Sequence, residues 1–148
     1  MTVPQQWSDH RSTRHTTNQS HGKISRNSKM NVIDIREKLN SFKQHWSPKV
    51  IAELNGQHVK VVKLLGEFDW HFHEHEDELF WVIRGTLVLH FRDKSVELKS
   101  GQMCVIPKTV EHKPVAKEEC EVILFEPAGT LNTGNLDNER TVSKPEEI

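Results

Sequence analysis

Cysteine, long apolar runs and net charge are all scarce in this chain of 148 residues. Its two cysteines, Cys104 and Cys120, form no CxxC pair, and so few cysteines argue against a disulfide-stabilised scaffold. No run of about 18 apolar residues occurs, so no membrane span is expected. The N-terminus lacks the apolar core of a secretory signal, and we therefore expect a cytoplasmic protein. A formal net charge of −1 gives no strong field for nucleic acid or an anionic membrane surface.

The two ends of the chain differ in composition from its middle. Residues 1–30 are rich in Ser, Thr, Asn and Gln and nearly free of aliphatic side chains, which predicts a disordered extension. Residues 31–39 resemble a short helix that Asp34 could cap. Residues 131–148 are polar and read as a C-terminal tail, anchored through Leu131. The expected domain therefore spans residues 31–130.

Within this domain the apolar pattern has a period of two, which is typical of β-strands. Asn55-Gly56 is a strong signal for a hairpin with a type I′ turn, because both central residues of that turn need a positive φ. Short strands are predicted at 50–54, 59–65, 70–73, 79–84, 86–91, 95–98, 103–106, 112–115 and 121–125, separated by turns such as Lys117-Glu118-Glu119. Many short strands at close spacing predict an all-β sandwich or barrel.

The predicted strand Leu79-Phe80-Trp81-Val82-Ile83 is apolar on both faces. A strand with one face in water would alternate apolar and polar residues. Both faces should therefore be covered, one by the core and the other by a second subunit or by the chain's own N-terminal segments. The first alternative predicts a homodimer.

The run Trp70-His71-Phe72-His73-Glu74-His75-Glu76-Asp77-Glu78 concentrates metal-binding side chains, and His112 follows on a later strand. Alternation along a strand places His71 and His73 on the same face. Glu78 opens the next strand and should point inward with Phe80 and Val82. Three neutral imidazoles and a carboxylate suit Fe, Mn, Ni, Co, Zn or Cu. Spacing alone leaves the pairs His71/His73 and His73/His75 both open.

These residues resemble the two motifs of the cupin family, G-x5-H-x-H-x(3,4)-E-x6-G and G-x5-P-x-G-x2-H-x3-N. The first is matched by His71-x-His73, Glu78 and Gly85, and the match selects His71 and His73 over His75. The second is matched by Gly101, Pro107 and His112. Three positions depart from the motifs: Gly66 lies one residue too close to His71, Thr109 stands in place of Gly, and Ala116 stands in place of Asn. The resemblance covers about residues 49–127.

The resemblance implies a double-stranded jelly-roll β-barrel that holds one divalent transition metal ion through His71, His73, Glu78 and His112. It also implies dimerisation through the outer sheet, in agreement with the doubly apolar strand. His75 is expected at the rim, as a weak candidate for an acid or base. The barrel lining should include Phe80, Val82, Leu89, Phe91 and Phe125, which gives a mostly apolar pocket for a small molecule.

Two functions follow from such a site. The first is a small metalloenzyme of the dioxygenase, isomerase or lyase class. The alternative is a non-catalytic module that binds or senses a small ligand, because fold and metal binding do not establish turnover.

Overall fold

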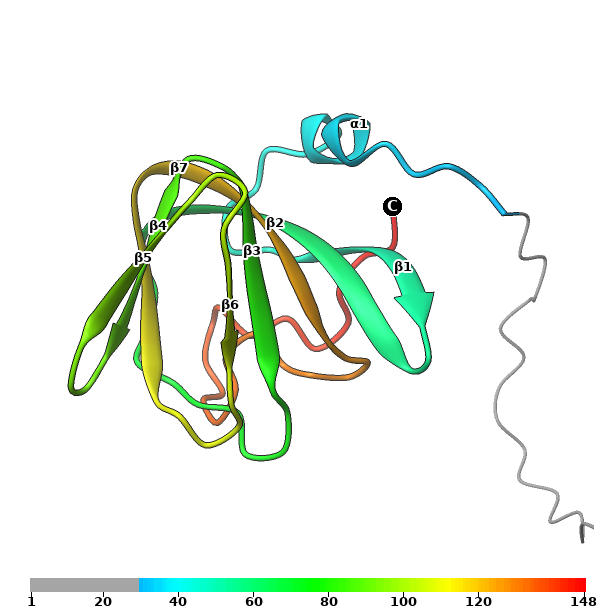
Figure 1. The fold of residues 1–148 in the computed structure, drawn as a ribbon. Coiled ribbons are helices and arrows are strands. Elements are labelled where there is room, and N and C mark those ends of the chain that lie inside the picture. Colours follow the sequence, from blue (N-terminus) through cyan, green and yellow to red (C-terminus); the bar gives the residue numbers. More distant parts are fainter. Residues whose placement is uncertain (1–29) are drawn as a thin grey trace, which may run out of the picture. The chain divides into compact units, whose positions relative to one another are not determined.

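The computed structural model describes residues 30–148, so the extension predicted for residues 1–30 lies, apart from Met30, outside the described residues. This part of the chain forms a mostly antiparallel β-structure with one short helix (Figure 1). The elements are α1 (Ile35–Asn40), β1 (Lys49–Leu54), β2 (Gln57–Glu67), β3 (Glu78–Arg84), β4 (Thr86–Phe91), β5 (Ser95–Lys99), β6 (Met103–Ile106) and β7 (His112–Pro127). No helix among the described residues is long and apolar enough to cross a membrane.

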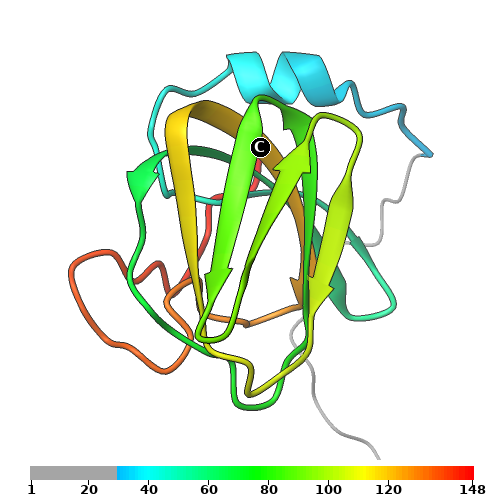
Figure 2. The same ribbon diagram turned by 60° about the vertical axis from the view of Figure 1, so that its left-hand side comes forward.

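The strand β7 organises the sheet. It pairs with β2 along one edge, and along its other edge it pairs first with β4 and then with β3. The path of paired strands runs β1-β2-β7-β3-β6, and β5 joins through β4. Figure 2 shows the β4–β5 hairpin in yellow-green beside these strands. Because β7 touches both groups of strands, residues from distant parts of the chain meet along it.

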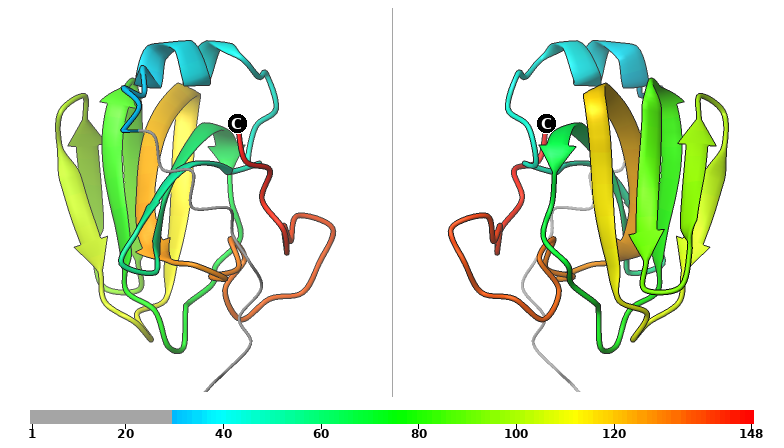
Figure 3. Two further views of the ribbon diagram at one scale, coloured as in Figure 1. Left: turned by 90° about the vertical axis from the view of Figure 1, so that its right-hand side faces the viewer. Right: turned by 90° about the vertical axis from the view of Figure 1, so that its left-hand side faces the viewer.

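Two apolar clusters hold the fold together. The inner one is formed by alternate side chains of six strands, and its buried members are Val62, Leu64, Phe80, Val82, Leu87, Leu89, Leu98, Ile106, Ala116, Cys120, Val122 and Leu124. In the outer one, Leu39 of α1 and Phe42, which follows the helix, pack against Val61 of β2 and Ile123 of β7. Figure 3 shows α1 beside these strands, with the C-terminus close to it. Ile148 packs against the outer cluster, so the chain's last residue helps to cover the sheet.

Local signals in the sequence correctly identified the helix start and the first hairpin. Asp34 caps α1, since its side chain accepts a hydrogen bond from the backbone N–H of Glu37 at 3.0 Å. Asn55 and Gly56 have φ values of 51° and 76°, the positive values that a type I′ turn requires. Glycine at position 56 adopts this backbone conformation without steric cost.

One predicted strand and one predicted turn were wrong. Residues 112–115 and 121–125 are strand, as predicted, but they belong to the single strand β7, which continues through Lys117-Glu118-Glu119 as an irregularity between the pairs Gly66↔Ala116 and Leu64↔Cys120. Residues 70–73 form only the isolated bridge His71↔His112. Phe72 instead exchanges hydrogen bonds with Asn135 of the C-terminal segment, which takes the place of a neighbouring strand.

The outer face of β3 is covered only in part. Ile83 packs against the outer cluster, so the chain's own N-terminal helix covers that end of the strand. Trp81, in the middle of the strand, is 40% exposed. Its neighbours on β6, Met103 and Val105, are each 54% exposed.

The C-terminal segment has no helix or strand, yet it is tied to the domain. The N–H of Val50 donates to the carbonyl of Glu146, and the N–H of Ile148 donates to the carbonyl of Val50. The predicted anchor Leu131 is 36% exposed, whereas Thr133 is fully buried. The segment is thus held by polar contacts and by its last residue, not by Leu131.

Candidate metal centre

The four residues expected at a metal site lie together inside the fold. One ligand atom from each of His71, His73, Glu78 and His112 lies within 4.8 Å of the others, and all four side chains are buried. His71 and His112 face each other across their bridge, with ring centroids 4.3 Å apart. Glu78 is the first residue of β3 and shares its inward face with Phe80 and Val82, as the alternation predicts.

Backbone carbonyls fix two of the imidazoles. Nδ1 of His71 lies 3.0 Å from the carbonyl oxygen of Asp69, and Nδ1 of His112 lies 2.9 Å from that of Val110. A carbonyl oxygen only accepts, so each Nδ1 carries the proton and donates it. In the neutral ring the lone pair is then on Nε2, the tautomer that a metal ligand needs.

Three atoms at the centre of the cluster are buried without a hydrogen-bond partner: Nε2 of His73, Nε2 of His112 and Oε2 of Glu78. Unpartnered buried polar atoms are costly, and several in one place call for an explanation. The Oε2 atom lies 3.2 Å from Nε2 of His73 and 3.3 Å from Nε2 of His112. Adjacent ligands that are each about 2.1 Å from one ion are separated by about 3 Å, so the donor set fits a transition metal ion.

The cluster shifts the pKa values of its members. Burial, assisted by the nearby His112, lowers the pKa of His71 to about 4, so that this imidazole is neutral near pH 7. Burial alone would raise the pKa of Glu78, but His112 and His73 outweigh it and hold that pKa below its usual range. Burial also opposes a charge on His73, yet the interaction with Glu78 prevails and raises its pKa. The carboxylate of Glu78 is thus ionised, as a ligand must be.

Two backbone contacts support the segment that carries His71 and His73. The N–H of Thr109 donates to the carbonyl of His73 at 2.6 Å, and Thr109 adopts a φ of 69°. This is the position where the cupin motif has glycine, so the β-branched residue keeps the turn at a cost in backbone strain. On the other side, a Cβ on Gly134 would lie 2.2 Å from the carbonyl oxygen of Phe72. Only glycine allows the C-terminal segment to approach so closely.

A second buried charged pair lies beside the cluster and was missed in the sequence. Lys60 donates from Nζ to Oε1 of Glu126 at 2.7 Å, and neither side chain is more than 2% exposed. Leu79 pairs with Phe125, so Glu78 and Glu126 are at the next opposed positions of the same antiparallel ladder. Burial and the charge of Glu78 raise the pKa of Glu126 to about 7, although Lys60 opposes this shift. Oε2 of Glu126 has no hydrogen-bond partner.

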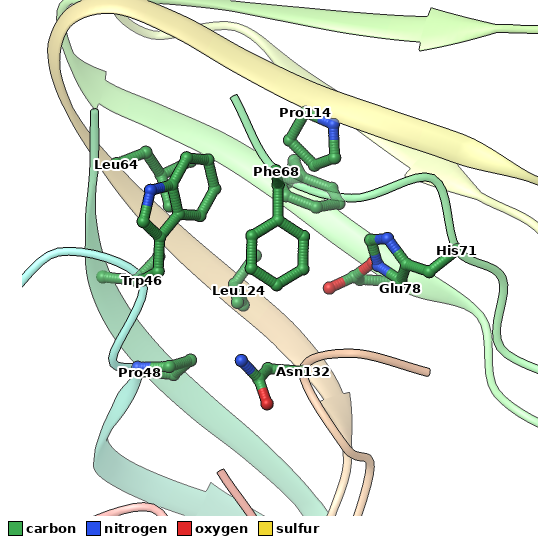
Figure 4. Close-up of a pocket in the computed structure, with 11 residues that line it drawn as sticks. Trp46, Pro48, Leu64, Phe68, His71, Glu78, Pro114, Leu124 and Asn132 are labelled. Atoms are coloured by element: carbon green, nitrogen blue, oxygen red, sulfur yellow. The ribbon is translucent and has the colours of Figure 1, made fainter. Parts of the chain in front are cut away.

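A pocket with mostly apolar walls opens onto the cluster and encloses about 350 Å³ of space, its mouth included. Trp46 and Pro48 lie at one end of it, His71 and Glu78 at the other, with Phe68 between them (Figure 4). Phe80 lines the pocket, as predicted for the lining. Trp46 and Asn132 could not be recognised from the sequence as pocket residues, because neither belongs to a motif.

Two further predictions concern single side chains. The side chain of His75 is 79% exposed in the turn after His73, and it lies outside the cluster. The prediction that Phe125 lines the interior was wrong, since the inward positions at this end of β7 are Leu124 and Glu126. The parity of Glu126 with Leu124, and of Lys60 with Val62, is the signal that could have revealed the second charged pair.

Comparison with known proteins identifies the fold family. The profile described as "Cupin domain" matches residues 60–126. A cupin-2 domain containing protein from Shewanella frigidimarina is 54% identical, over 65% of this chain and 94% of that one, with a TM-score of 0.64. The protein NMB1881 from Neisseria meningitidis is 31% identical, over 66% of this chain and 100% of that one, with a TM-score of 0.62.

A curated relative, the uncharacterized protein YdbB of Bacillus subtilis, is 37% identical over 75 residues. That match covers 50% of this chain and 66% of YdbB, just under two thirds of its length. The family profile, the identity to the Shewanella protein and the buried His and Glu cluster agree with the two motifs found in the sequence. The chain belongs to the cupin family.

Proposed function

We propose that His71, His73, Glu78 and His112 bind one divalent transition metal ion per chain, and that the protein is a small metalloenzyme of the dioxygenase, isomerase or lyase class. The observation that carries this proposal is the convergence of three buried, unpartnered ligand atoms on one point of the interior. Such a group of donors is stabilised by a cation and is costly without one.

The bound metal would act as a Lewis acid or, if it is iron, would activate O₂. The chain's own residues orient the metal ligands. The carbonyls of Asp69 and Val110 hold two imidazoles in the required tautomer, and burial keeps water from the ligands. Glu126 lies beside the ligand Glu78 on the neighbouring strand, and burial and the charge of Glu78 raise its pKa to about 7.

Elemental analysis of the purified protein tests the site. We expect about one transition metal ion per chain in the wild type and almost none in His73→Ala, since a neutral methyl group replaces a ligand. His75→Ala is the matched control, because His75 is two residues away and exposed. Equal metal content in wild type and His73→Ala would contradict the proposed ligand set.

The identity of the metal then separates the classes of reaction. Iron favours oxygen chemistry, whereas zinc or manganese favours isomerase, hydrolytic or structural roles. A metal-loaded protein that saturates with a small ligand and turns over none would favour the alternative, a binding or sensing module.

We also propose that the chain forms a homodimer through the exposed apolar patch of Trp81, Met103 and Val105. Trp81 pairs with Met103 and Leu79 pairs with Val105, so these side chains are contiguous on the outer face of β3 and β6. Apolar surface of this kind marks a contact site more often than free surface. Sedimentation velocity should give a dimer for the wild type and a monomer for the double variant Trp81→Lys, Met103→Lys. A monomeric wild type would contradict the proposal.

A further inference from the structure

The pocket beside the candidate metal centre includes residues from outside the segment that matches the cupin profile. Its walls include Trp46 and Pro48, which precede residues 60–126, and Asn132, which follows them. In Figure 4 Trp46 and Pro48 lie away from His71 and Glu78, and Asn132 lies between the two groups. The part of the pocket that would meet the body of a ligand is therefore supplied by the two flanking segments.

Trp46 is held in place by unusually many constraints. Its φ is 56°, a left-handed conformation that a bulky residue adopts only when its surroundings impose it. Its backbone N–H donates to the carbonyl of Lys63, and its indole Nε1–H donates to that of Leu65, both at 2.9 Å. Its ring stacks on Phe68, with centroids 4.8 Å apart. The indole is thus a rigid apolar wall, and strain of this kind is typical of functional positions.

Most of the hydrogen-bonding capacity of the pocket wall is already used. The indole N–H of Trp46 is bonded to the backbone. The amide of Asn132 donates to the carbonyl of Arg140 at 2.9 Å and accepts from the N–H of Val142 at 2.7 Å. Nδ1 of His71 is bonded to Asp69. Apart from these side chains and Glu78, the wall consists of proline, aliphatic and phenylalanine side chains.

Besides its metal end, a ligand in this pocket can meet at most the second N–H and the second lone pair of the Asn132 amide. A body with a charge or several hydroxyl groups would lose its hydrogen bonds to water and find too few partners in the wall, which is costly. We propose that the ligand has one oxygen-donor head for the metal and a compact apolar body, and that Trp46, Pro48 and Asn132 select that body. Sugars, polyols and amino acids do not fit this chemistry. The inference rests on the proposed metal site for the head of the ligand, but not for its body.

Two hydroxamates with one metal-binding head test the choice of body. Isovalerohydroxamate carries a branched hydrocarbon, and 3-hydroxybutanohydroxamate differs from it only by a hydroxyl in place of one methyl group. Each is titrated into ¹⁵N-labelled full-length protein, loaded with one equivalent of Zn²⁺ or treated with EDTA. The indole N–H signal of Trp46 reports binding. We expect at least about tenfold tighter binding of isovalerohydroxamate, as for a hydroxyl placed in an apolar pocket.

Trp46→Asn removes the ring while asparagine tolerates a positive φ. The indole N–H signal that disappears in this variant is that of Trp46. Binding to the variant itself is then followed through backbone amide signals. We expect this variant to lose most of the preference for isovalerohydroxamate with unchanged Zn²⁺ content. Trp81→Asn, on the outer face of β3, is the control and should keep the preference. If Trp46→Asn does not fold, the comparison of the two probes on the wild type decides alone.

The outcomes separate this inference from the proposed function. Equal affinity for the two probes, or tighter binding of the hydroxylated one, would overturn the apolar ligand class whether or not Zn²⁺ is bound. A preference that survives in folded Trp46→Asn would overturn the role of Trp46. A protein that takes up no Zn²⁺ but still prefers isovalerohydroxamate after EDTA treatment contradicts the metal site and supports the ligand class.

Discussion

Lys60 and Glu126 form an ion pair in the interior, with Nζ and Oε1 2.7 Å apart and both side chains almost fully buried. Nζ also lies 3.4 Å from the carbonyl oxygen of Thr130, which anchors the turn after β7. Removing both charges from water is expensive, and the pair recovers that cost only while both partners are present. The pair lies next to Glu78, so its effect on stability can be measured together with its effect on metal binding.

We predict that Lys60→Met lowers the free energy of unfolding by about 1–3 kcal/mol, because the buried carboxyl group of Glu126 loses its hydrogen-bond partner and takes up a proton. The double variant Lys60→Met, Glu126→Leu should recover most of this loss. Urea unfolding of the wild type, the single variant and the double variant measures both effects. If the double variant is no more stable than Lys60→Met, the pair does not act as a unit.

Acid should destabilise the EDTA-treated protein through His71. Its pKa is lowered to about 4 in the folded state by burial, against 6.5 in the unfolded chain, so protons bind first to the unfolded chain. The stability from neutral His71 is fully present above about pH 6.5 and is lost as the pH falls through 4. Unfolding of the wild type and of His71→Gln is measured from pH 4 to pH 8.

The wild type should lose stability relative to His71→Gln as the pH drops from 6.5 to 4, and the difference should be flat above that window. Glutamine carries no charge at any of these pH values, so the variant serves as the reference. If the stability of the wild type minus that of His71→Gln instead rises on acidification, the assignment is contradicted.

Gly134→Ala should be far more damaging than Gly129→Ala. Both glycines have positive φ, which costs alanine about 1–2 kcal/mol. A Cβ at Gly134 would also lie 2.2 Å from the carbonyl oxygen of Phe72, whereas nothing lies within 4 Å of one at Gly129. Thermal or urea unfolding should show an additional loss of about 1–3 kcal/mol, as for overpacking.

Because Phe72 lies between His71 and His73, Gly134→Ala should also weaken metal binding while Gly129→Ala should not. Competition with a coloured chelator compares the two variants. Equal affinities in both would mean that the C-terminal segment does not position the histidines.

Thr109→Gly should stabilise the protein by up to about 1 kcal/mol. The strain of a β-branched residue at positive φ is relieved, and the greater freedom of glycine in the unfolded chain cancels only part of this gain. Thr86→Gly, at the start of β4 where φ is not positive, should destabilise instead. The two changes in melting temperature should therefore have opposite signs, and a loss of stability in Thr109→Gly would contradict this account.

Most features that could be predicted from the sequence depend on local patterns of residues. The alternation of His71 with His73, and of Glu78 with Phe80 and Val82, depends on neighbouring residues, but it left His75 open as an alternative. The resemblance to the two cupin motifs selected the set His71, His73, Glu78 and His112 before the structure was known. The cap at Asp34 and the Asn55-Gly56 turn are equally local.

The parts that were missed depend on distant contacts. Three charged residues at 117–119 resemble a turn, and only the pairing of β2 with Ala116 and Cys120 on either side of them shows that the strand continues. Glu126 lay beyond the predicted end of its strand at residue 125, so its inward direction was not recognised. Trp46 adopts a backbone conformation that its residue type does not favour, and only its contacts with residues 63, 65 and 68 explain it.

The position of β7 in the chain has a consequence for how this protein is made. β2, β3 and β4 all pair with it, yet it follows all three in the chain. On a ribosome these three strands emerge earlier and have exposed edges until their shared neighbour follows. Exposed strand edges favour pairing with other chains, and contacts between distant residues slow folding. The domain therefore cannot complete its sheet before β7 has emerged, and a nascent chain stopped before β7 should depend on chaperones to remain in solution.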